Sequence, residues 1–130
     1  MLRFFVAVLA LTAMAFQIAS ADEIRHTEFL GTMLGTWAPS SDQCATNAKS
    51  KVVIEMTKYH TAAGSCAVRW IVETAGSRGA NYAVHAQCDG ASAPARPDTV
   101  NLILRPEGND RVSIGKSFED LKPYLRCPAP

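Results

Sequence analysis

Two cysteines bracket an alternating stretch of the chain, and this arrangement constrains the fold more than any other feature of the sequence. Between Cys66 and Cys88, apolar residues occupy alternate positions on both sides of a turn-forming segment, residues 75–79. Alternation with a period of two around a glycine-containing turn is typical of a β-hairpin with one buried face. When the hairpin is centred on Ser77, Cys66 lies opposite Cys88.

The same register gathers the bulky apolar residues of both strands on one face. The expected facing pairs are Val68 with Ala86, Trp70 with Val84, and Val72 with Tyr82. A slip of one residue would turn the apolar set of one strand toward water, so a buried face specifies the register strongly.

The chain has four cysteines, and they are expected to form two disulfides. A zinc site is disfavoured because the cysteines are widely spaced and no C-x-x-C pair occurs. Directly opposite residues of an antiparallel pair are close enough to bridge. The register therefore favours Cys66–Cys88, which leaves Cys44–Cys127. Spacing alone does not choose, so Cys44–Cys66 with Cys88–Cys127 stays open as the alternative.

The first 21 residues have the features of a secretory signal peptide. Arg3 supplies a positive charge, residues 4–18 are almost wholly apolar, and Ala19-Ser20-Ala21 is a small-x-small cleavage pattern. The apolar run is shorter than the roughly 20 residues that span a bilayer as a helix. We therefore expect cleavage after Ala21 and a single periplasmic or secreted domain, residues 22–130, with no stable membrane insertion.

The charges of the chain are balanced and scattered. There are 13 lysines and arginines against 12 acidic residues, and no long run of one sign occurs. Proteins that bind nucleic acid or anionic membranes usually present a basic face. The composition therefore argues against a nucleic-acid partner.

Further alternating runs predict strands outside the hairpin. These are residues 34–37, 51–57, 99–104, 111–116 and 122–127. About seven short strands joined by turns predict an all-β fold, a small antiparallel barrel or sandwich. A short N-terminal helix over residues 23–33 is expected from an uneven apolar stripe that follows Asp22 as N-cap.

Gly35-Thr36-Trp37 is a G-x-W motif at the start of the first expected strand, and Arg126 stands near the end of the last. This pattern resembles the lipocalin-like (calycin) barrels. The resemblance implies that Trp37 closes the barrel base and that Arg126 packs across it. The layout is also similar to small uncharacterised exported proteins of proteobacteria, which start with G-T-W and end in aromatic-x-Arg-Cys.

The G-x-W with a following cysteine is also similar to the secreted bacterial inhibitors of alkaline metalloproteases. That resemblance implies an inhibitory N-terminal segment, which would correspond to residues 22–30 here. It also implies a disulfide within the N-terminal part of the chain, which would join Cys44 to Cys66.

No catalytic, metal or cofactor site is expected. His26, His60 and His85 have no second ligand at metal spacing, and no G-x-S-x-G motif is present. The acidic neighbours Glu119 and Asp120 are expected in a solvated turn.

Aromatic residues are the remaining candidates for a binding function. Trp70, Tyr82 and Tyr59 are expected either to line a barrel interior or to fill it. We expect a non-enzymatic binding module for a small apolar ligand or an envelope protein. The alternatives are a metalloprotease inhibitor and an enzyme of unrecognised type.

Overall fold

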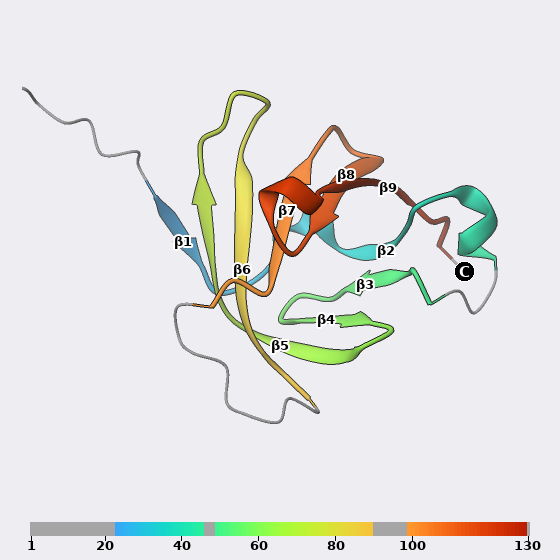
Figure 1. Cartoon of the computed structure of the whole chain (residues 1–130), viewed down its shortest axis with the longest axis horizontal. Helices are drawn as coiled ribbons and strands as arrows, with labels where there is room; N and C mark the ends of the chain where they lie inside the picture. The colour runs from blue at the N-terminus through green and yellow to red at the C-terminus, as the bar shows by residue number, and fades with distance from the viewer. Residues whose placement is uncertain (1–22, 46–48, 90–98, 130) are drawn as a thin grey trace, which may run out of the picture.

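The computed structural model describes residues 23–45, 49–89 and 99–129 (Figure 1). The predicted signal peptide, residues 1–21, lies outside the described residues. The described part holds nine strands and three short 3₁₀ helices. In chain order they are β1 (Ile24–His26), η1 (Gly31–Met33), β2 (Gly35–Ala38), η2 (Ser41–Cys44), β3 (Val52–Ile54), β4 (Lys58–Thr61), β5 (Gly64–Thr74), β6 (Asn81–Cys88), β7 (Leu102–Pro106), β8 (Arg111–Gly115), η3 (Phe118–Asp120) and β9 (Lys122–Arg126). None of the described helices is long and apolar enough to cross a membrane.

Eight of the strands form a closed antiparallel barrel. From β2 to β9 each strand pairs with the next along the chain, and β9 pairs back onto β2. Closure gives each of these strands a partner on both sides, although β4 covers only the first part of β5. The all-β prediction is confirmed, and its barrel alternative is the one observed. The expected number of seven strands is wrong, because β1 and the short strand β4 were not predicted.

β1 occupies the stretch where a helix was expected. Ile24, Arg25 and His26 pair with Glu73, Val72 and Ile71 of β5. β5 is 11 residues long, and β4 covers only its first part. The remaining edge offers unpaired backbone groups, and the N-terminal segment satisfies them as a strand. The predicted helix over residues 23–33 is therefore wrong, apart from the 3₁₀ turn η1.

A β-bulge changes the register of the β5–β6 hairpin. Cys66 faces Cys88 and Val68 faces Ala86, as expected. A shift between Val68 and Trp70 then pairs Trp70 with His85 instead of Val84. Bulges increase the local twist and re-aim the side chains that follow them. The expected Trp70–Val84 and Val72–Tyr82 pairs are therefore wrong.

The bulge decides which residues of β5 enter the core. Ile71, now opposite Val84, is 1% exposed, whereas Trp70 lies on the outer face of the sheet. The core occupies the barrel interior. Its most completely buried large side chains are Trp37, Ile71, Leu104 and Val84.

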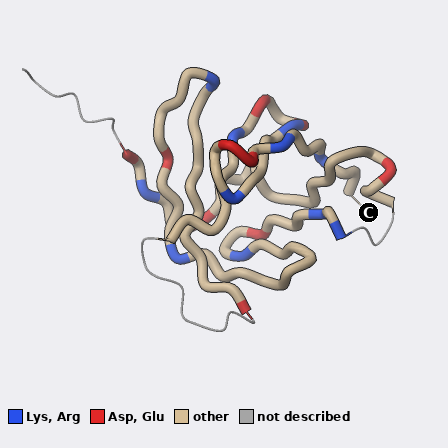
Figure 2. Tube along the Cα trace, viewed as in Figure 1, with Lys and Arg blue, Asp and Glu red and all other residues tan. Residues whose placement is uncertain are grey.

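Two disulfides cross-link the barrel. One joins Cys66 of β5 to Cys88 of β6, and the other joins Cys44 of η2 to Cys127, directly after β9. No cysteine is left free. Disulfides persist in oxidising compartments, so this pairing points to an extracellular environment. Lysines and arginines are interspersed with acidic residues over the described part of the chain (Figure 2).

Candidate functional site

Trp37 on β2 fills one end of the barrel interior. Its side chain is buried, and its indole N–H donates a hydrogen bond to the Met33 carbonyl at 3.0 Å. The guanidinium of Arg126 lies over the indole, with Cζ 4.3 Å from the ring centroid. The quadrupole of the ring attracts a cation in this position. The cavity beside Trp37 has a volume of only about 10 Å³, too small for an organic ligand, and we call this the closed end.

Arg126 also joins three backbone segments at the closed end. Nη1 donates to the Leu34 carbonyl at 2.6 Å, Nη2 to the Thr32 carbonyl at 2.6 Å, and Nε to the Asn109 carbonyl at 3.2 Å. The planar guanidinium has five N–H donors, which suits it to such bridging. Gly35 has a φ of 127°, and a Cβ there would lie 3.0 Å from Nη1. The glycine of the G-x-W motif therefore makes room for this arginine.

The opposite end of the barrel is open. Two adjoining cavities of about 290 Å³ each lie there and share the lining residues Thr61, Ala63, Leu102 and Lys116. These residues come from the end of β4, the β4–β5 turn, the start of β7 and the segment directly after β8. Each cavity is close to the lower limit of about 300 Å³ for pockets that hold small molecules. We call the two cavities together the open-end site.

The deeper walls of the open-end site are apolar. Tyr59, Cys66 and Leu102 line the first cavity, and Val52, Leu102 and Ile114 line the second. All five side chains are less than 9% exposed. Cys88 completes the wall of the first cavity beside Cys66, so the hairpin disulfide belongs to the site.

Three lysines stand at the rim of the site. Lys49 and Lys51 precede β3, and Lys116 follows β8. Among the described residues that line the two cavities, no acidic side chain occurs. The rim is therefore basic although the whole chain is almost neutral.

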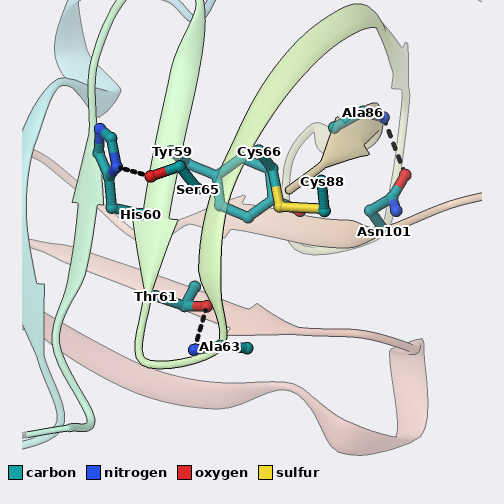
Figure 3. Close-up of a disulfide and its surroundings, with 9 residues drawn as sticks. All are labelled: Tyr59, His60, Thr61, Ala63, Ser65, Cys66, Ala86, Cys88 and Asn101. Atoms are coloured by element: carbon teal, nitrogen blue, oxygen red, sulfur yellow. Dashed lines mark hydrogen bonds between the residues drawn. A yellow bond between two sulfur atoms is a disulfide. The ribbon is translucent and has the colours of Figure 1, made fainter. Parts of the chain in front are cut away.

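Tyr59 lines the first cavity of the open-end site. Its ring contacts Phe29 edge-on, and its hydroxyl oxygen is 4.0 Å from Cys88 Sγ (Figure 3). The side chain is 3% exposed. Burial disfavours the ionised form and raises the pKa of Tyr59 to about 12.

This raised pKa predicts a loss of stability in alkali. The unfolded chain releases the Tyr59 proton near its ordinary pKa of 10.0, whereas the folded chain holds it to about pH 12. The stabilising contribution is complete below pH 10 and is lost as the pH rises toward 12. We expect the urea midpoint to fall over this range, and to fall less steeply in Tyr59→Phe.

A residual slope is expected in that variant, because burial also raises the pKa of Tyr82. Ultraviolet titration of tyrosinate absorbance is a second readout, and it should lose its latest component in Tyr59→Phe. An equally steep fall in the variant and the parent would contradict the assignment.

The structure separates the three aromatic residues that were expected to line a ligand cavity. Tyr59 lines the open-end site. Tyr82 is buried in the core opposite Glu73, away from that site. Trp70 does not line the interior, because the bulge turns it outward. There it stacks on His85 at 4.8 Å, and the Arg25 guanidinium lies 5.1 Å from its ring.

Sequence reasoning missed most residues of the open-end site. Ala63, Leu102 and Lys116 carry no motif and are far apart in the sequence. Their common property is their position at strand ends on one side of the barrel, which requires the strand order. The alternation of Leu102 with Leu104 did indicate that Leu102 faces inward.

The barrel is thus filled at the end that holds Trp37 and has cavities at the other end. Comparisons with protein-family models, curated proteins and solved structures find no significant match to this chain. The function is therefore inferred from the residues of the closed end and of the open-end site.

A hydrogen-bonded cluster of polar side chains lies on the outer face of β4 and β5. His60 Nδ1 is 2.6 Å from Ser65 Oγ, and His60 Nε2 is 2.9 Å from Glu55. These residue types can activate a hydroxyl, but catalysis also needs a substrate cavity and oxyanion donors. His60, Ser65 and Glu55 line neither cavity of the open-end site. The described residues contain no group of three or more metal-ligating side chains.

The segment that would correspond to an inhibitory arm is packed on the barrel. β1 is hydrogen-bonded to β5, and His26 Nε2 lies 3.1 Å from the Glu73 carboxylate. Phe29 is 4% exposed, and its N–H donates to the Met56 carbonyl at 2.9 Å. A free arm able to enter a protease cleft would require the loss of these contacts.

Proposed function

We propose that this protein is an exported, non-enzymatic binding barrel that takes one small, largely apolar ligand at its open end. The observation that carries the proposal is the asymmetry of the barrel. Trp37 fills one end, whereas buried apolar walls around Leu102 border empty space at the other. Pockets that bind small molecules are concave and mostly apolar, with a few polar groups near them.

Three further features support this proposal. An eight-stranded barrel is wide enough to hold one small ligand, as in the lipocalins. The Trp37–Arg126 contact is the one that the resemblance to calycins implies. The two disulfides suit export into an oxidising compartment.

Binding is tested with a neutral apolar fluorescent probe, 1-N-phenylnaphthylamine, and the purified protein with both disulfides formed. We expect saturable binding with one probe per chain. Ala63→Trp should weaken it by about tenfold or more, because Ala63 is exposed and borders both cavities, so an indole there fills the opening.

The matched control is Ala75→Trp. Ala75 is also exposed but lies in the β5–β6 turn, outside the lining of both cavities. It should leave binding unchanged. Absence of saturable probe binding to the parent would overturn the proposed function. Equal losses in the two variants would overturn the assignment of the site.

A further inference from the structure

The open-end site combines apolar walls with a positively charged rim. Its deep walls are the buried side chains of Tyr59, Leu102 and Ile114, and its rim holds Lys49, Lys51 and Lys116. We infer that the ligand is an amphiphile with an apolar tail and an anionic head, and that the head is a carboxylate held by the rim lysines. This inference rests on the proposed function and names the ligand class for the same site.

The lysines approach the cavity from two separate parts of the fold. Lys49 and Lys51 lie before β3, and Lys116 follows β8. Lys116 continues the alternation of Val112 and Ile114, the buried, inward-facing residues of β8. A head group at the rim would therefore meet positive charge on more than one side.

The three lysines also lack acidic partners within the described residues. The ion pairs found there are His26–Glu73, His60–Glu55 and Arg105–Glu107. At the same end of the barrel, the Asp120 carboxylate accepts a hydrogen bond from Ser117 Oγ at 2.8 Å. No carboxylate of the described residues forms an ion pair with a rim lysine, and a bound carboxylate would provide such a partner.

The apolar walls favour a ligand that has an apolar tail. A ligand that is charged throughout would lose its hydration against Leu102 and Ile114 without compensation. A wholly apolar ligand would fill the cavity, but the rim lysines would stay solvated and would gain no anionic partner. A medium-chain carboxylate satisfies both parts of the site, and decanoate is a suitable probe.

The test compares decanoate with decan-1-ol, which has the same chain and no charge, by isothermal titration at a pH where the acid is ionised. We expect the parent protein to bind decanoate about five- to tenfold more tightly, and added salt to reduce this preference. In the triple variant Lys49→Gln, Lys51→Gln and Lys116→Gln, decanoate should lose about that factor while decan-1-ol binding is unchanged.

The matched control is Lys58→Gln. Lys58 is exposed at the start of β4 and lines neither cavity, so the variant removes one charge but should not change binding. If neither probe binds the parent, the proposed function fails together with the inference. If both probes bind the parent equally, or the triple variant weakens both by the same factor, the inference is overturned and the proposed function stands.

Discussion

Replacing both Cys44 and Cys127 with alanine should lower the free energy of unfolding by about 4.5 kcal/mol, the largest loss expected from removing either disulfide. The bond spans 83 positions, so breaking it frees most of the chain in the unfolded state. It also anchors η2 to the residue that follows β9. β9 and β2 form the seam that closes the barrel, and only two residue pairs are in register there.

The hairpin disulfide provides the matched comparison. Cys66–Cys88 spans 22 positions, for which the same chain-entropy relation gives about 3.4 kcal/mol. Urea unfolding of the two double-alanine variants should therefore rank the seam bond above the hairpin bond. In thermal unfolding, the loss of the seam bond should lower Tm by roughly 20–30 °C. The opposite ranking would show that loop length does not govern these two bonds.

The two double variants should also differ in binding. Cys66 and Cys88 line the first cavity of the open-end site, whereas Cys44 and Cys127 line neither cavity. At a temperature where both variants are folded, only the loss of the hairpin bond should weaken binding of the neutral probe.

The alternation around Ser77 was sufficient to predict the hairpin and the facing of Cys66 and Cys88, and the further alternating runs predicted the all-β fold. It was not sufficient to find the bulge. From Trp70 to Val72 three apolar residues follow one another, so alternation does not say which of them faces inward. The packing partners of these residues decide which one faces inward. Trp70 stacks on His85 on the outer face, and Ile71 packs in the core.

The N-terminal strand depended on tertiary structure in the same way. Residues 24–26 have no strong strand pattern, and they pair because β5 extends beyond β4. The open-end site could not be predicted from the sequence for a different reason. Whether a barrel is filled depends on side-chain sizes at each level of the barrel. Large Trp37 at one end and small Ala63 at the other become comparable only once the strands are in register.

Arg126→Met should cost about 3 kcal/mol of unfolding free energy, the second large effect expected in this fold. The variant keeps an apolar stem over Trp37 but removes all the guanidinium donors. The carbonyls of Leu34, Thr32 and Asn109 then lose a charged donor. Hydrogen bonds to charged groups contribute about 1.5–3 kcal/mol each. Of these three bonds one is part-buried and two are exposed, so their sum is well below that of three buried bonds.

Arg126→Lys separates charge from geometry. An ammonium keeps the cation near Trp37 but cannot reach three carbonyls in one plane, so about half of the stability should return. Arg69→Met is the matched control, because Arg69 is exposed and, among the described residues, its side chain donates only to the Gln87 side chain. It should cost less than about 0.5 kcal/mol.

A double-mutant cycle isolates the contact between the arginine and the indole. Combining Trp37→Phe with Arg126→Met should give a coupling energy of about 1 kcal/mol, because a phenyl ring attracts the cation less strongly than an indole does. Zero coupling together with a full loss in Arg126→Met would mean that the backbone carbonyls alone hold Arg126. Trp37 would then close the barrel by its volume, and Arg126 would act by joining η1, the segment after it and the β7–β8 turn.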